Sequence, residues 1–132
     1  MSAEPLRAQV DHAWAEKHYP KGISWNIDIP EITLPEMFDK SFAQYPDHDC
    51  LEFLGKRLKY REVESLVKRA AKGLQDMGVE KGSKVGLCMP NTSYYPIMFM
   101  AAQKIGATVV NYSPLYTEDE LEELVEDSGT DV

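Results

Sequence analysis

The side chains with metal-binding or acid–base chemistry lie far apart along this sequence. Asp47-His48-Asp49 joins two carboxylates to an imidazole, which are donor types of a metal site. No second group of ligands completes a coordination shell, so we interpret this segment as a polar turn between a helix and a strand. His12 and His18 do not share a helix face, as ligands at i and i+4 would. The residue types therefore predict no metal site and no catalytic residue.

Two further features have a chemical and a structural interpretation. Cys50 and Cys88 each lie in an apolar segment, which is typical of small core residues. Two isolated cysteines give neither the ligand spacing of a metal site nor a disulfide framework, so we expect reduced thiols and a cytoplasmic protein. Lys81-Gly82-Ser83 is shorter than a phosphate-binding loop and lacks its other glycine, so it predicts a turn and no nucleotide-binding residue.

Two loops are placed where ligands bind. Residues 89–92 and 111–117 each follow an apolar segment that has the pattern of a buried parallel strand. The carboxyl ends of such strands are where open α/β sheets bind ligands. Neither loop contains an acid, a base or a nucleophile with a partner. We therefore expect binding loops without a catalytic residue.

Composition narrows the class of protein. The 132 residues suffice for one compact domain. There are 14 Lys and Arg against 22 Asp and Glu, and a net charge of −8 argues against nucleic-acid binding, which needs a basic face. No apolar run reaches the ~20 residues that span a bilayer, and peripheral association with the inner membrane stays open.

Periodicity divides the chain near residue 33. Apolar residues at helical spacing predict a short helix over residues 5–18, and alternation from Ile23 to Ile29 predicts an extended arm. Residues 1–33 are thus expected to form an N-terminal helix and arm, and residues 34–132 an α/β subdomain.

The subdomain alternates between helical and strand patterns. Thr33-Leu34-Pro35-Glu36 has the form of a capping box and opens a helix that ends near Pro46. The other expected elements are a β-hairpin over 50–60 with its turn at Gly55-Lys56, helices over 61–77, 94–105 and 117–128, and strands over 84–89 and 108–112. This order predicts an α/β fold of parallel strands with helices on both faces, plus the hairpin.

Two of these helices have unusual compositions. Residues 117–128 begin with a second capping box and are strongly acidic, which we interpret as a solvated face over buried Leu121, Leu124 and Val125. Residues 94–102 are apolar nearly all round. We expect that helix to be buried between two layers, and the alternative is the lining of an apolar ligand tunnel.

Several segments in order resemble the adenylate-forming enzymes. Residues 59–63 are similar to their tyrosine-x-glutamate-leucine helix start. Residues 78–85 resemble their glycine-valine-x-x-glycine-aspartate-x-valine turn, with Ser83 in place of the aspartate. Met89-Pro90-Asn91, followed by an apolar helix, also fits the family.

Two more segments resemble one branch of that family. Residues 109–117 look like the valine-asparagine-x-x-proline-leucine-tyrosine-threonine loop of long-chain fatty-acyl-CoA synthetases, and residues 18–30 resemble the arm of bacterial members. The resemblance implies the N-terminal part of the family's large domain. It also implies that Ser113, Pro114, Leu115 and Tyr116 lie near the coenzyme A side of the site.

The resemblance also implies a reaction. Such enzymes activate a fatty acid with Mg-ATP to an acyl-adenylate and pass the acyl group to coenzyme A. Their phosphate-binding loop, adenine motif, hinge and adenylation lysine have no matching residue up to Val132. No catalytic, nucleotide-binding or metal-binding residue is therefore carried over, and we expect an inactive N-terminal piece of an active enzyme.

Two alternatives stay open. The chain can be a stand-alone binding or interaction module with the same fold, or part of a synthetase for a medium-chain or aryl carboxylic acid. In the fragment hypothesis the strands over 84–89 and 108–112 each lack a neighbour. Because an unpaired apolar edge invites pairing with another copy, we expect self-association.

Overall fold

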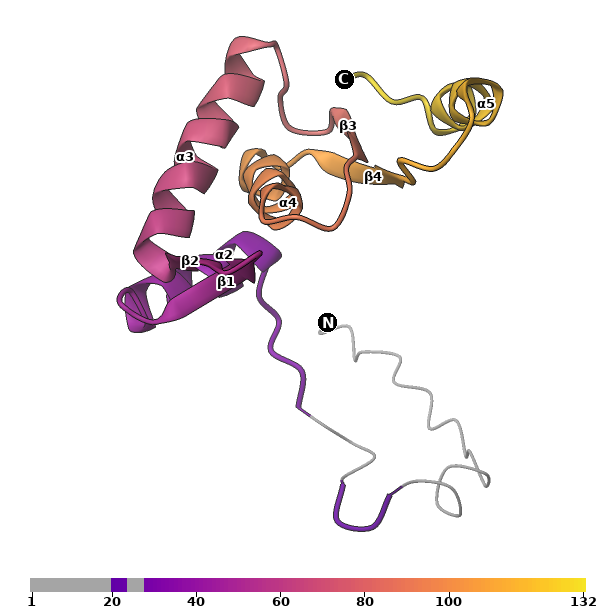
Figure 1. Ribbon diagram of the computed structural model, residues 1–132. Coiled ribbons are helices and arrows are strands. Elements are labelled where there is room, and N and C mark those ends of the chain that lie inside the picture. The colour runs from indigo at the N-terminus through magenta and orange to yellow at the C-terminus, as the bar shows by residue number, and fades with distance from the viewer. Residues whose placement is uncertain (1–19, 24–27) are drawn as a thin grey trace, which may run out of the picture. The chain divides into compact units, whose positions relative to one another are not determined.

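The computed structural model describes residues 20–23 and 28–132 (Figure 1). The chain divides into two compact units, residues 1–31 and 32–132, and each is described by itself. In the first unit, the N–H of Ile23 donates to the carbonyl of Pro20 at 3.3 Å and closes a turn. The helix expected over 5–18, and Trp25 and Ile27 of the expected arm, lie outside the described residues.

The second unit begins with a helix and a hairpin and then alternates helices with strands. In chain order, with the labels of Figure 1, its elements are α2 (Leu34–Gln44), β1 (Asp49–Phe53), β2 (Lys56–Lys59), α3 (Tyr60–Asp76), β3 (Lys84–Cys88), α4 (Tyr94–Ile105), β4 (Thr108–Tyr112) and α5 (Glu118–Ser128). All elements expected beyond residue 33 are present, within a residue or two of the expected bounds.

Capping boxes begin two of the helices, as the sequence predicts. At α2, the N–H of Glu36 donates to Thr33 Oγ1 at 3.3 Å, and the N–H of Thr33 donates to Glu36 Oε2 at 2.8 Å. At α5, Thr117 and Glu120 form the same pair of bonds at 3.4 and 2.9 Å. Each box supplies acceptors to N–H groups that a helix start leaves without an intrahelical partner.

The hairpin turn lies one residue earlier than expected. β1 and β2 pair antiparallel with Phe53 opposite Lys56, so Leu54 and Gly55 form the turn. Their φ angles are 49° and 79°. Two positive φ values give a turn whose twist matches that of the strands, and this requirement outweighs the cost of placing leucine at the first position. Leu54 points into solvent, with 91% of its surface exposed.

β3 and β4 form a parallel pair with a helix on each face. Val85 lies opposite Val109, and Leu87 lies opposite Asn111. Because side chains alternate along a strand, these residues share one face, which packs against α4. On the other face, the hydroxyl of Tyr112 lies 2.6 Å from Ser128 Oγ at the end of α5. Figure 1 shows α4 and α5 on opposite sides of the pair, which confirms the predicted α/β class.

The chain returns from α5 to the far edge of β3. The N–H of Gly86 donates to the carbonyl of Val132 at 2.7 Å, and the N–H groups of Asp131 and Val132 approach the carbonyl of Lys84 at 2.9 and 3.4 Å. This is the bond pattern of a parallel neighbour. The expectation that β3 lacks a neighbour is therefore wrong at Lys84 and Gly86. Within residues 28–132, no strand pairs with the outer edge of β4.

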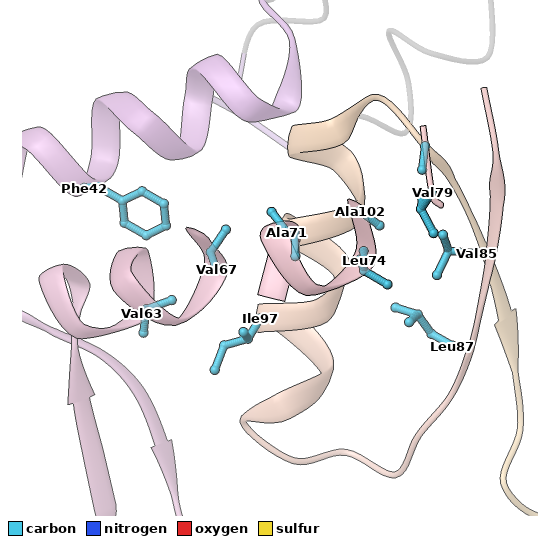
Figure 2. Packing of buried hydrophobic residues seen from close by; sticks show 12 residues of the cluster. Phe42, Val63, Val67, Ala71, Leu74, Val79, Val85, Leu87, Ile97 and Ala102 are labelled. Atoms are coloured by element: carbon cyan, nitrogen blue, oxygen red, sulfur yellow. The ribbon is translucent and has the colours of Figure 1, made fainter. Parts of the chain in front are cut away.

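One apolar cluster holds α2, α3, α4 and the β3–β4 pair together (Figure 2). α3 contributes a stripe at helical spacing, and Val63 is fully buried on it. Phe42 of α2 and Ile97 of α4 meet this stripe, and Val85 and Leu87 extend the cluster to the sheet. The core therefore fixes α4 and β3 relative to each other.

The expected burial of Leu121, Leu124 and Val125 on α5 is wrong, whereas α4 packs largely as expected. No residue of α5 is buried, and Leu124 is 37% exposed, because α5 contacts the sheet chiefly through the residues at its C-terminal end. On α4, Ile97, Ala101 and Ala102 are buried, whereas Tyr94 is 70% exposed. α4 contacts α2 and α3 as well as β3 and β4, so it packs between the other helices and the sheet as expected, with Tyr94 at its exposed start. Within the described ranges, no helix combines the length and the hydropathy that crossing a bilayer needs.

Candidate functional site

The loops after β3 and β4 diverge from the same edge of the sheet. Residues 89–93 lead from β3 to α4 on one face, and residues 113–117 lead from β4 to α5 on the other. Neighbouring parallel strands whose loops run to opposite faces form a topological switch point, the usual ligand-binding position of an open α/β sheet. Both loops were expected to bind ligand, and the topology brings them together. We call these two segments the switch-point loops.

The four candidate residues lie on the first turn of the second loop. Ser113 is half-buried, its Oγ accepts from the N–H of Leu115 at 3.2 Å, and its carbonyl accepts from the N–H of Tyr116 at 3.1 Å. Pro114 and Tyr116 are exposed, and Leu115 is 90% exposed. The turn thus satisfies its own backbone and presents apolar and aromatic side chains outward.

Side-chain contacts surround the carboxyl end of β4 on both faces of the sheet. On the α5 face, Cys88 Sγ lies 3.7 Å from the carbonyl oxygen of Ser113, which is a weak thiol contact. On the α4 face, the hydroxyl of Tyr95 donates to Asn111 Oδ1 at 2.8 Å. The carboxyl end of β4 is therefore held from both sides.

An open hollow of about 310 Å³ lies beside the first switch-point loop. Most of its lining is apolar, and its polar residues come chiefly from the first switch-point loop and from β1. The lining residues are Leu51, Glu52, Phe53, Asn91, Thr92, Ser93, Tyr95 and Pro96. Tyr95 connects the hollow to Asn111, so the hollow adjoins the switch point.

The arrangement suits binding rather than proton transfer. The switch-point loops offer hydroxyl, amide and carbonyl groups together with the exposed Leu115 and Tyr116, which can contact a ligand that has polar and apolar parts. They contain no acid–base pair.

Thr117 ends the second loop and caps α5. Hydrogen bonds from its backbone N–H and from its hydroxyl, in that order of effect, lower the pKa of Glu120 below its ordinary value.

The residues considered as metal ligands are engaged elsewhere. Asp47 pairs with Arg61 at 2.5 Å, and Asp49 pairs with Arg57 at 3.1 Å. No group of three metal-ligating side chains gathers in the part of the chain that the structure describes. We therefore assign no ligand of Mg²⁺ or of the ATP phosphates to these residues.

The sequence pattern of the AMP-binding enzyme family matches residues 38–132. The chain belongs to this family. Among curated members of the AMP-binding enzyme family, the long-chain-fatty-acid–CoA ligase of Yersinia pestis is 36% identical over 122 residues, which are 91% of this chain and 22% of that protein. The ligase of the same name from Bacillus subtilis is 34% identical over 119 residues, or 86% of this chain and 20% of that protein. The chain thus spans about a fifth of the length of these relatives.

Solved structures of AMP-binding enzymes share the fold. The N-terminal subdomain of NpsA from Klebsiella oxytoca superposes with a TM-score of 0.71 at 26% identity, and the match covers 74% of this chain and 26% of that one. A fatty acyl CoA synthetase from Mycobacterium tuberculosis gives a TM-score of 0.69 at 25% identity, over 74% of this chain and 20% of that one.

Sequence reasoning located the switch-point loops but missed the side chains that support them. It assigned no role to Tyr95, although a tyrosine at the start of a helix beside a strand end can reach a polar partner with its hydroxyl. It also passed over Tyr112, which is only 8% exposed. A tyrosine in a strand that is expected to be covered on both faces is a usable signal, since its hydroxyl requires a hydrogen-bond partner.

Proposed function

We propose that this chain is the N-terminal part of a long-chain fatty acid–CoA ligase. The observation that carries the proposal is the 34–38% identity to ligases of that name over 84–91% of the chain. The whole enzyme would activate a long-chain fatty acid with Mg-ATP to an acyl-adenylate and then form the thioester with coenzyme A. The proposed location is the cytoplasm, which the free thiols of Cys50 and Cys88 support.

Within that enzyme, residues 113–116 would line the coenzyme A side of the site. The exposed Leu115 and Tyr116 on a turn at a switch point support this assignment. Titration of coenzyme A into the isotope-labelled chain should shift the amide resonances of the switch-point loops. Shifts confined to other segments, or none at millimolar coenzyme A, would remove the assignment and leave the family membership intact.

We further propose that residues 1–132 alone do not turn over substrate. The described residues bring no proton-transfer pair and no metal ligands to the switch point. Fatty-acid-dependent release of pyrophosphate should stay at background with the isolated chain. Turnover above background would contradict this proposal.

An aryl acid is the second candidate substrate. Its support is that matching NpsA structures, at 26% identity, are complexes with 3-hydroxyanthranilyl-AMSN and anthranilyl-AMSN. The higher identity to long-chain ligases favours a fatty acid. An enzyme encoded by the full reading frame should form thioesters faster from palmitate than from octanoate or anthranilate. A stop codon directly after the codon for Val132 would instead support a stand-alone binding module.

Self-association is proposed for the isolated chain through the outer edge of β4. Backbone groups alternate along a strand, and the N–H of Thr108 points to β3, where it donates to the carbonyl of Ser83 at 2.8 Å. The N–H and C=O groups of Val109 and Asn111 therefore point away from β3. Sedimentation velocity should show dimers as concentration rises, and a monomer at all concentrations up to millimolar would contradict this.

A further inference from the structure

Three hydroxyl groups meet where β4 ends and α5 ends. The hydroxyl of Tyr112 lies 2.6 Å from Ser128 Oγ and 2.5 Å from Thr130 Oγ1, and the last two oxygens are 2.9 Å apart. Ser128 also donates to the carbonyl of Val125 at 3.2 Å. With that proton committed, Ser128 is an acceptor within the cluster, and the hydroxyls of Tyr112 and Thr130 supply the protons. We call Tyr112, Ser128 and Thr130 the hydroxyl cluster.

Few other contacts hold α5 to the sheet. α5 has no buried residue, so apolar packing contributes little to its position. Its remaining bonds converge on the same end: Lys84 Nζ donates to the carbonyl of Ser128 at 2.5 Å, and the N–H of Lys84 donates to Asp131 Oδ2 at 2.8 Å. Among these contacts of the described residues, the Lys84 bonds tie the end of α5 to β3, and the hydroxyl cluster is the attachment that reaches β4.

The hydroxyl cluster brings the end of α5 back to the residue that precedes the candidate loop. Tyr112 is the last residue of β4 and directly precedes Ser113, while Ser128 is the last residue of α5. The loop of residues 113–117 therefore runs out from Tyr112, and the helix that follows it returns to the hydroxyl of the same tyrosine. The loop is thus continuous with a helix whose last residue contacts the residue directly before the loop.

We propose that Tyr112 is a positioning residue whose hydroxyl, through Ser128 and Thr130, holds α5 and thereby sets the position of the loop of residues 113–116. The ligand-binding part of this inference rests on the proposed function of that loop. The aromatic ring and the hydroxyl of Tyr112 have separable roles. The ring lies over Gly86, where a Cβ atom would come within 2.7 Å of Tyr112 Cε2. Phenylalanine keeps this packing and removes only the hydrogen bonds.

The test is hydrogen–deuterium exchange on the full chain. In Tyr112→Phe, peptides that cover residues 113–128 should exchange about five- to tenfold faster, as expected when local bonds are lost without global unfolding. Peptides from β3 and α3 should keep their rates. The matched control is Tyr94→Phe, whose ring is 70% exposed. Unchanged exchange over 113–128, or an equal increase in every element, would overturn the inference.

A second variant removes the hydrogen-bond partners of Tyr112 in the hydroxyl cluster. Ser128→Ala with Thr130→Val removes both partners and keeps Tyr112, so it should give the same local increase in exchange. Adding Tyr112→Phe to it should cause little further change, because the variants disrupt one shared network. Fully additive effects would show that Tyr112 acts elsewhere and would overturn the inference.

Coenzyme A binding separates this inference from the proposed function. If coenzyme A binds the unaltered chain at the switch-point loops, Tyr112→Phe should raise its dissociation constant at least threefold, and Tyr94→Phe should leave it unchanged. Equal affinity in Tyr112→Phe despite a loosened loop would overturn the positioning role. If the unaltered chain binds no coenzyme A, the loop assignment fails, and the exchange measurement alone decides whether Tyr112 holds α5.

Discussion

Gly86 lies where the two neighbouring chain segments leave no room for a side chain. A Cβ atom built at this position would stand 2.7 Å from Tyr112 Cε2 and 3.1 Å from Thr130 Cγ2. Gly86 is the central residue of β3, and its N–H donates a hydrogen bond to the carbonyl of Val132. Neither the strand nor the buried ring of Tyr112 can retreat easily, since the ring is fixed at its hydroxyl end as well.

Gly86→Ala is therefore expected to destabilise the fold by about 1–3 kcal/mol, the usual cost of overpacking a fitted site. Gly73→Ala is the matched control. Gly73 lies inside α3, where an added methyl group would meet no atom within 4 Å, so alanine there should stabilise by about 0.5–1 kcal/mol. Urea unfolding followed by circular dichroism measures both. Equal effects of the two substitutions would show that the contact with Tyr112 is not limiting.

At the scale of elements, features that depend on neighbouring residues were predictable from the sequence, and features that depend on long-range packing were not. Residues close together in the sequence determine the capping boxes at Thr33 and Thr117 and the apolar stripe of α3. The structure has all three where the sequence predicts them. The exposure of Leu124 was not predictable in that way. Its apolar spacing is the same as that of a buried position, and only the placement of α5 relative to the sheet decides whether anything covers it.

Substitution of the two capping threonines should affect stability differently, globally at Thr33 and locally at Thr117. Thr33→Ala removes the cap of α2, whose Phe42 is buried in the core, so it should lower global stability by about 1 kcal/mol. Thr117→Ala removes the equivalent cap of α5, which has no buried residue, so it should fray α5 and leave the global unfolding free energy nearly unchanged. Chemical denaturation and hydrogen exchange distinguish the two cases, and a full loss of about 1 kcal/mol in Thr117→Ala would show that α5 is part of the core.

The cap of α5 should also respond to acid. Hydrogen bonds from the backbone N–H and the hydroxyl of Thr117 lower the pKa of Glu120 from its ordinary value of 4.5. Because the folded pKa is the lower one, the stabilisation of the cap is present above 4.5 and is lost as the pH falls through the folded value. Carbon NMR of the Glu120 carboxyl should give a midpoint below 4.5, and Thr117→Val should raise that midpoint. A midpoint at or above 4.5 in the unaltered chain would mean that the box does not form in solution.

At the scale of the whole molecule, the position of the candidate site followed from sequence order, whereas its supporting contacts did not. Alternating strands and helices imply a parallel sheet, and ligands bind at the carboxyl ends of its strands. The hydroxyl cluster joins residues 112 and 130, and the edge pairing joins residues 86 and 132. No local pattern specifies such contacts, because they depend on how α5 crosses the sheet.

The second unit should fold without the first. Among the residues that the structure describes, its buried cluster runs from Phe42 to Ala107 and lies within residues 32–132. Because buried apolar surface supplies most of the folding free energy, a chain that begins at Ile32 should keep its unfolding midpoint within a few degrees of that of the full chain and remain cooperative. Differential scanning calorimetry of both chains measures this. A large loss of stability on removal of residues 1–31 would show that the arm packs on the second unit and supplies part of its core.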